Sequence, residues 1–146
     1  MIISKDFKEF LELLNKNKVK YLVVGGYAIA FHGYPRYTKD IDLWILMEKS
    51  NAESILKTLN EFGFSGLGIT VEDLNTPDNV IQLGYPPNRI DIMTAASGLN
   101  FDECYNKKVE VDIEGVSVTF IDLESLKKNK KATGRHQDLA DLENLE

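Results

Sequence analysis

Three aspartates in apolar surroundings are the residues of this sequence best suited to chemistry. Asp40 and Asp42 lie two positions apart, and Asp91 lies between two isoleucines further along the chain. Because side chains alternate between the two faces of a β-strand, Asp40 and Asp42 should share a face, roughly 7 Å apart at the backbone. If the strand that carries Asp91 is a neighbour, three carboxylates converge on one patch.

A cluster of carboxylates of this kind suits divalent metal ions. Like charges held close together repel each other, and bound cations relieve that repulsion. Mg²⁺ prefers carboxylate oxygens and retains positions for water and phosphate. Two ions about 3.5–4 Å apart can activate an attacking oxygen and stabilise the leaving one in phosphoryl-type transfer. The alternative is that each aspartate simply belongs to the solvated face of a sheet.

A pair of glycines, Gly25 and Gly26, follows a short apolar segment and precedes a segment suited to a helix. At a junction of this kind, backbone amides can approach a phosphate while the helix N-terminus attracts its charge. The alternative is a tight turn without a ligand. The order of the motifs is more informative, since the glycine pair is followed by thirteen residues, the two aspartates and later the third aspartate.

That order resembles the pattern of the polymerase-beta nucleotidyltransferase superfamily, in which a glycine pair or a glycine-serine pair precedes two acids at alternate positions and a third acid lies on another strand. The likeness extends to a branch of small bacterial nucleotidyltransferases of undefined substrate through five segments, at residues 25–28, 36–43, 81–84, 87–91 and 134–141. It covers about residues 21–145, and all three acidic positions are present.

The resemblance implies an NTP donor, Mg²⁺ or Mn²⁺, and transfer of a nucleoside monophosphate to an acceptor hydroxyl with release of pyrophosphate. It assigns Asp40 and Asp42 to both metal ions, and Asp91 to the catalytic ion and to activation of the acceptor. The acceptor stays open between a small molecule, an RNA and a protein. Relatives include antibiotic-modifying enzymes, RNA-tailing enzymes and members of toxin–antitoxin pairs.

Two residues just ahead of the first aspartate are predicted to bind the nucleotide. Arg36 and Thr38 lie in a loop that can overhang the substrate, and a guanidinium binds phosphate through two hydrogen bonds. Pairing of Arg36 with a surface acid is an equal alternative. Trp44 shares the strand face of Asp42, where sheet packing is its favoured role, and Gln82 is a candidate to orient a metal ligand.

The basic cluster at residues 127–131, followed by Arg135, is distinctive in an acidic protein. If this segment is helical, Lys127, Lys131 and Arg135 lie along one face. We predict that Lys131 and Arg135 bind nucleotide, through a triphosphate or an RNA backbone. The alternative is a solvated helix face whose charges pair with nearby acids, namely Glu124, Asp138 and Asp141.

Three other functions are compatible with parts of this pattern. A catalytically weak nucleotide-binding module would be expected to lack a carboxylate or a glycine that this sequence retains. A subunit controlled by a partner, such as a small helical protein of a toxin–antitoxin pair or a second copy in a homodimer, fits the short length. A two-metal nuclease also uses clustered acids, but hydrolysis needs no cradle for a triphosphate.

The composition limits the partners and the setting. The chain has 146 residues and a formal net charge of −6, so a polynucleotide would have to be engaged locally rather than by a broad basic surface. The single cysteine, Cys104, forms no internal disulfide, and no apolar run approaches the ~20 residues that span a bilayer. We expect a cytoplasmic protein without a membrane segment.

The elements that position these residues follow from hydrophobic periodicity, caps and turns. Helices are predicted to begin at capping residues or after the glycine pair, at Ser4, Tyr27, Ser50, Asn100 and Asp122. Strands are predicted where apolar residues run together or alternate, at residues 21–24, 40–47, 79–84, 89–93, 108–113 and 116–121.

This intermixing of helices and strands predicts an α/β (α+β) fold, with a single mixed β-sheet flanked by helices. Glu114 and Gly115 are expected to join the last two strands, with the glycine in a bulge because glutamate is a poor first residue of a type I′ turn. Residues 122–146 form a C-terminal helical segment that is broken near Gly134. Together with the resemblance, this predicts one nucleotidyltransferase domain of the polymerase-beta-like fold over residues 1–146.

Overall fold

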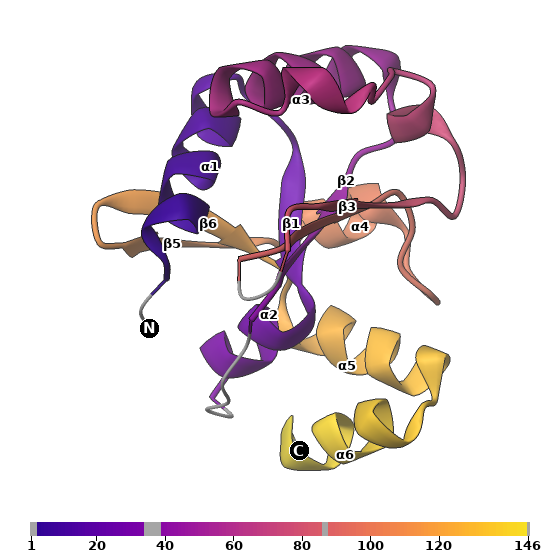
Figure 1. The fold of residues 1–146 in the computed structure, drawn as a ribbon. Helices are drawn as coiled ribbons and strands as arrows, with labels where there is room; N and C mark the ends of the chain where they lie inside the picture. The colour runs from indigo at the N-terminus through magenta and orange to yellow at the C-terminus, as the bar shows by residue number, and fades with distance from the viewer. Residues whose placement is uncertain (1–2, 34–38, 86–87, 146) are drawn as a thin grey trace.

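The computed structural model describes residues 3–33, 39–85 and 88–145, so Arg36 and Thr38, both predicted to bind nucleotide, lie outside the described residues (Figure 1). The helices of the described chain are α1 (Lys5–Lys16), α2 (Gly25–Phe31), α3 (Lys49–Phe62), α4 (Phe101–Asn106), α5 (Leu123–Thr133) and α6 (His136–Leu145), with 3₁₀ turns at Ser65–Leu67 and Asp73–Asn75. The strands are β1 (Tyr21–Val24), β2 (Ile41–Ile45), β3 (Val80–Leu83), β4 (Ile90–Met93), β5 (Val109–Ile113) and β6 (Val116–Phe120).

The described strands form one mixed sheet in the order β3-β4-β2-β1-β6-β5. At its centre, β2 is parallel to β4 and antiparallel to β1. A parallel pairing joins β1 to β6, and the antiparallel pairs β3–β4 and β5–β6 complete the two ends. The central strands are almost entirely buried, whereas the edge strands β3 and β5 are partly exposed. The predicted single mixed sheet flanked by helices is confirmed.

Helices cover both faces of the sheet. In Figure 1, α1 and α3 lie together above it, while α2, α5 and α6 lie below it. The upper layer is apolar, since Phe10 of α1 is fully buried and meets Phe62 of α3 edge to face, with ring centroids 5.1 Å apart. On the sheet, Trp44 of β2 packs against Phe101 of α4, also with centroids 5.1 Å apart. Trp44 thus has the sheet-packing role that the sequence favours.

The caps predicted at Ser4, Asn100 and Asp122 are confirmed. Each side chain accepts a hydrogen bond from a backbone amide in the first turn of its helix, α1, α4 or α5. These bonds satisfy amides that have no partner inside the helix.

No helix in the described ranges combines the length and the apolar character that crossing a membrane requires.

Two local predictions are wrong in detail. Helix α3 begins at Lys49, after a Glu48 with extended backbone, so Ser50 is not its N-cap; the Ser50 hydroxyl donates to Glu48 Oε1 instead, at 2.8 Å. In the hairpin between β5 and β6, Glu114 and Gly115 have φ of 52° and 88°. Both residues therefore take the left-handed conformation of a type I′ turn, and the predicted bulge is absent from this two-residue connection.

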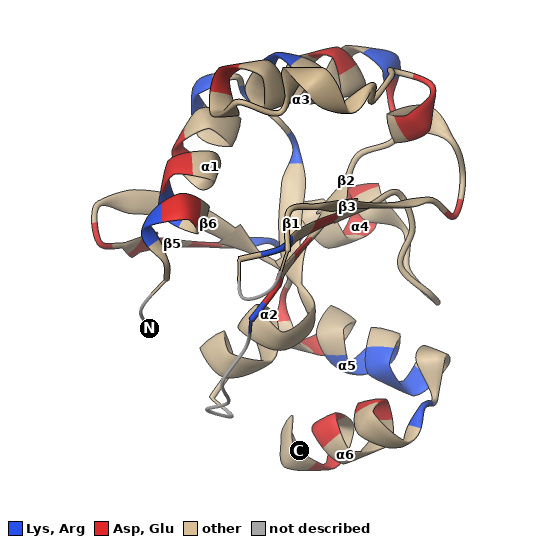
Figure 2. Ribbon diagram, in the orientation of Figure 1, with Lys and Arg blue, Asp and Glu red and all other residues tan. Residues whose placement is uncertain are grey.

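The C-terminal segment is a pair of helices, as the expected break near Gly134 requires. Gly134 ends α5 with a φ of 64°, and α6 begins two residues later. Arg135 therefore lies outside α5, which interrupts the helical stripe predicted for Lys127, Lys131 and Arg135. Figure 2 shows basic residues along α5 and acidic residues along the neighbouring α6.

Candidate active site

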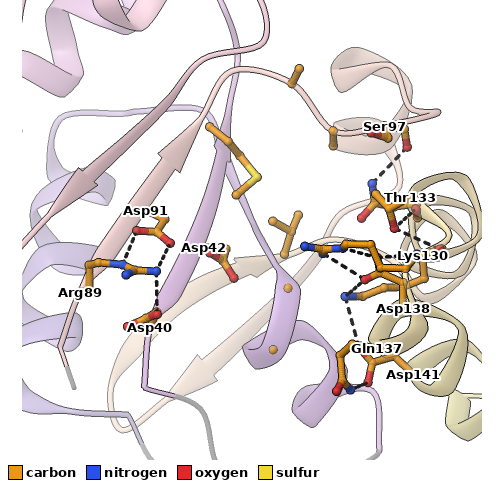
Figure 3. A pocket seen from close by; sticks show the side chains of 18 of the residues that line it. Asp40, Asp42, Arg89, Asp91, Ser97, Lys130, Thr133, Gln137, Asp138 and Asp141 are labelled. Atoms are coloured by element: carbon orange, nitrogen blue, oxygen red, sulfur yellow. Dashed lines mark hydrogen bonds and ion pairs between the residues drawn. The ribbon is translucent and has the colours of Figure 1, made fainter. Parts of the chain in front are cut away.

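The three predicted metal-binding aspartates meet where β2 and β4 lie side by side. The parallel register pairs Asp42 with Asp91, and Asp40 immediately precedes the first residue of β2. Their neighbours Ile41 and Ile90 are buried and pair with each other, which fixes both strands in the core. All three aspartates line one cavity, in agreement with the alternation of side chains along the strands (Figure 3).

Gly25 lies beside this cluster because β1 pairs with β2, with Val24 opposite Asp42. Its φ is 65°, a left-handed conformation that residues with a side chain rarely adopt. A Cβ at this position would overlap the Asp42 carboxylate. The first glycine of the pair is therefore required for the close approach of the backbone to Asp42, and Gly26 lines the same cavity.

Gly25→Ala is expected to lower the free energy of unfolding by about 2 kcal/mol, because the new side chain is strained and displaces Asp42. Gly68→Ala is a matched control, since Gly68 has a φ of 71° but nothing within 4 Å of an added Cβ. Urea denaturation of both variants separates backbone strain from the displacement of Asp42. Equal losses of stability in the two variants would contradict the overlap.

Arg89 holds two of the three carboxylates. Its Nη2 lies 2.9 Å from Asp40 Oδ2, and its Nε and Nη2 donate to Asp91 Oδ1 and Oδ2 at 2.9 and 3.1 Å (Figure 3). The backbone sets this position, because the Ile41 amide donates to the Arg89 carbonyl at 3.1 Å. The guanidinium thus bridges Asp40 and Asp91 as one positive charge between two negative ones.

Asp42 has an acidity that differs strongly from that of a free aspartate. Burial, the charges of Asp91 and Asp40 and a hydrogen bond with Asp91 raise its pKa to about 7. Lys130 acts in the opposite direction and lowers that pKa only in part. Asp42 therefore exchanges its proton near neutral pH, and a nearby divalent cation would favour its ionised form.

The opposite wall of the cavity is the hairpin of α5 and α6. Lys130 of α5 is buried, and its Nζ lies 3.2 Å from Asp138 Oδ1 and 3.3 Å from Asp141 Oδ2 on α6. Burial opposes ionisation of Asp138, but hydrogen bonds from Arg135, Thr133 and Lys130 outweigh it and hold its pKa well below the usual range. Within the described span of α6, the fully buried residues are these two aspartates, while Leu145 is partly buried against the core.

The loop after β4 connects this wall to the strands. Asn129 of α5 donates to the Ser97 carbonyl at 3.1 Å. At the other end of the hairpin, Arg135 Nε donates to Asp138 Oδ2 at 2.6 Å, while 75% of the Arg135 side chain stays exposed. The two walls enclose a cavity of about 620 Å³, whose lining includes the glycine pair, the three aspartates, Arg89 and the ionic group on α5 and α6 (Figure 3).

The donor chemistry of this cavity fits a hard divalent cation. Three carboxylates reach it from neighbouring strands, and such oxygens are the ligands that Mg²⁺ and Mn²⁺ prefer. Burial and the charges of Asp91 and Asp40 raise the pKa of Asp42, and a divalent cation beside these carboxylates would offset their mutual repulsion. Among the described residues, no group of three or more His, Cys, Asp or Glu is already arranged to hold a metal ion, which agrees with Arg89 holding Asp40 and Asp91.

The residues predicted to bind nucleotide take different places around the cavity. Gly25, Gly26 and Arg135 line it, whereas Lys131 is exposed on α5 and lies outside the described lining. Its neighbour Lys130 takes the inward position instead. The contacts of Lys130 agree with the alternative interpretation of the basic cluster, in which its charges pair with the acids of the last helix.

Sequence reasoning misses Arg89 and does not single out Lys130. A signal for Arg89 is present, since an arginine two positions before Asp91 shares its strand face. A signal for Lys130 is also present, because it follows the buried Leu126 by four residues and so lies on the same helix face. Each signal can be used only once it is known which face of the strand, or which side of the helix, points towards the cavity.

Comparison with protein families gives a match over nearly the whole chain. Residues 3–146 match the family described as "Nucleotidyltransferase of unknown function (DUF6036)". No curated protein gives a significant match to the sequence.

Several solved structures share the fold. The lincosamide antibiotic adenylyltransferase LnuA, in its lincomycin-bound crystal structure, has a TM-score of 0.62 and 17% identity, covering 99% of this chain and 96% of that one. TM1012 from Thermotoga maritima has a TM-score of 0.62 and 18% identity, covering 94% of this chain and 88% of that one. The antibiotic-resistance factor ANT(2″)-Ia has a TM-score of 0.58 and 13% identity, covering 96% and 80%. These likenesses show a common fold.

Proposed function

Since the chain belongs to the DUF6036 family of nucleotidyltransferases of unknown function, we propose that it transfers a nucleoside monophosphate from an NTP to an acceptor hydroxyl. The observation that carries this proposal is the register of β2 and β4, which brings Asp40, Asp42 and Asp91 to one cavity beside Gly25 and Gly26. A bond forms between the acceptor oxygen and the α-phosphorus, and the bond to the leaving pyrophosphate breaks.

The three aspartates are the metal ligands in this proposal. Asp40 and Asp42 would hold two divalent ions, Mg²⁺ or Mn²⁺, and Asp91 would hold the catalytic one. When bound, such ions stabilise the charge that develops on the phosphate and on the leaving group. Asp91 also helps to remove the proton of the acceptor hydroxyl, while the buried strands β2 and β4 keep the carboxylates in register.

The phosphates of the nucleotide are proposed to lie between the two walls of the cavity. Gly25 and Gly26 line one side, where Gly25 allows Asp42 to lie against the backbone and Gly26 has no side chain to keep a phosphate away. Arg135 is the better cation on the other side, since 75% of its side chain is exposed whereas Lys130 is buried between two carboxylates. Lys131 is exposed and is not among the described residues that line the cavity, so its contact with phosphate remains a prediction.

A small molecule is the acceptor class that the comparisons and the charge support best. This chain covers 96% of LnuA, an adenylyltransferase of lincosamide antibiotics, so a fold of this size is sufficient in that protein for a small-molecule acceptor. A net charge of −6 also disfavours the broad phosphate contacts by which proteins bind polynucleotides.

The test is incubation of the protein with Mg²⁺, fractionated cell extract and each NTP labelled at the α-phosphate. We expect label in the small-molecule fraction with the wild type and none with Asp42→Asn. Label confined to RNA or protein would contradict the proposed acceptor class. Absence of labelled product with every NTP and every fraction would contradict nucleotidyl transfer itself.

A further inference from the structure

Arg89 engages the carboxylate oxygens that a metal ion would use. Arg89 donates hydrogen bonds to both carboxylate oxygens of Asp91, at 2.9 and 3.1 Å, and its Nη2 lies 2.9 Å from Asp40 Oδ2. These contacts occupy lone pairs of both carboxylates, and the pair with Asp91 has the bidentate geometry that guanidinium groups prefer. A divalent ion that approaches the same oxygens would lie beside the guanidinium, and two neighbouring positive charges repel each other.

The Arg89 side chain can leave this position without any change in the sheet. Its carbonyl is fixed by the hydrogen bond from the Ile41 amide at 3.1 Å, which belongs to the pairing of β2 with β4. The side chain itself is 27% exposed, so solvent reaches it from the cavity. Rotation about the side-chain bonds would break the pairs with Asp40 and Asp91 and leave the backbone bond intact.

We propose that Arg89 is an internal cation that holds Asp40 and Asp91 in the metal-free protein and is displaced when a divalent metal ion binds them. The inference rests on the metal site of the proposed function. In the metal-free protein, Arg89 offsets the repulsion between the carboxylates and keeps them in place. Because the metal ion competes with Arg89, this residue lowers the metal affinity of the site.

The test measures binding of Mn²⁺ in the absence of nucleotide, by electron paramagnetic resonance of the free ion. We expect Arg89→Gln to bind Mn²⁺ about tenfold more tightly than the wild type, because the competing cation has been removed. Without metal, the same variant should melt at a lower temperature than the wild type. Saturating Mn²⁺ should then raise its melting temperature by more than it raises that of the wild type.

Two further variants separate a local effect from a change in total charge. Arg135→Gln removes the same charge from the opposite wall and should change the Mn²⁺ affinity by about twofold or less. Arg89→Lys keeps a cation without the planar fork and should have an affinity between those of the wild type and Arg89→Gln.

Equal Mn²⁺ affinities in the wild type and both Arg89 variants would overturn the inference and leave the proposed transfer intact. An increase in Arg135→Gln as large as that in Arg89→Gln would also overturn it, since the effect would then come from total charge. Absence of Mn²⁺ binding in all four proteins would overturn the metal site, and with it both the inference and the proposed mechanism.

Discussion

Asp42→Asn is expected to lower the rate of nucleotidyl transfer by about a thousandfold, which corresponds to about 4 kcal/mol of lost transition-state stabilisation. Asparagine keeps the shape of the side chain but lacks the charge that a shared metal ligand needs. The measurement is the rate of label transfer from the NTP at saturating Mg²⁺. Asp102→Asn is the control, because Asp102 is exposed in the first turn of α4. A variant that retained the wild-type rate would contradict the role of Asp42 as a metal ligand.

The same substitution is expected to stabilise the metal-free protein in mildly alkaline solution. In the folded protein, burial and the neighbouring carboxylates raise the pKa of Asp42 from its ordinary value of 3.8 to about 7. A carboxyl group with a raised pKa stabilises the folded state fully only below the unfolded pKa, and this contribution is lost as the pH rises through the folded pKa. Above that pH, the folded protein contains a buried charge that the unfolded chain exposes to water.

Asparagine carries no charge at any pH, so the gain in stability should depend on pH in a defined direction. We expect Asp42→Asn to gain on the order of 2 kcal/mol near pH 8 and almost nothing near pH 4. Thermal melts of both proteins in the presence of a metal chelator measure this difference. A gain of the same size at both pH values would contradict the raised pKa and would point to packing instead.

The strand positions of the aspartates could be predicted from the sequence because local rules determine them. Ile41, Leu43 and Ile45 alternate with polar or aromatic positions, and their burial fixes which face of β2 carries Asp42. The pairing of β2 with β4 is different, since these strands are separated by more than forty residues and no local pattern specifies a parallel register. The resemblance to a known superfamily implies only that the third acid lies on another strand, so the pairing itself came from the structure.

The parts of the candidate site that the sequence did not predict depend on the rotation of a helix about its axis or on the register of two strands. On α5, consecutive lysines give little apolar periodicity, and a rotation of about 100° per residue decides which lysine points inward. The phase is fixed by the cap at Asp122 and by burial of Leu126, which turn Lys130 rather than Lys131 towards α6. Arg89 depends on register in the same way, because its position beside Asp40 exists only once β2 and β4 are paired.

Lys130→Met is expected to lower the free energy of unfolding by about 3 kcal/mol and the melting temperature by about 10 °C. Methionine fills a similar volume but leaves Asp138 and Asp141, each only 1% exposed, without the cation between them. The fully buried residues of α6 are these two acids, and Leu145 at its end is only partly buried against the core, so the ionic group is a main contact of this helix. Hydrogen exchange should therefore show faster exchange of the α6 amides before the rest of the fold opens.

Lys131→Met is the matched control, because Lys131 is the next residue of α5 and is exposed. It should melt within about 1 °C of the wild type, as surface substitutions generally do. A loss of stability in Lys131→Met equal to that in Lys130→Met would contradict the ionic group as the cause, since both variants remove one lysine charge from the same helix.

The double variant Lys130→Met/Asp141→Asn tests whether the loss comes from surplus buried charge. Asp138 retains Arg135 at 2.6 Å in this variant, and an asparagine at position 141 can still accept the hydrogen bond that Gln137 donates to Asp141 at 2.8 Å. We expect the double variant to recover more than half of the stability lost in Lys130→Met, a coupling on the order of 2 kcal/mol in the double-mutant cycle. If the losses of stability caused by Lys130→Met and by Asp141→Asn simply added in the double variant, Lys130 would stabilise α6 by packing rather than by charge.

The α5–α6 hairpin forms one wall of the cavity, so the stability of α6 and the affinity for NTP should change together. Recovery of stability in the double variant should therefore be accompanied by recovery of NTP affinity, measured by calorimetry on the same samples.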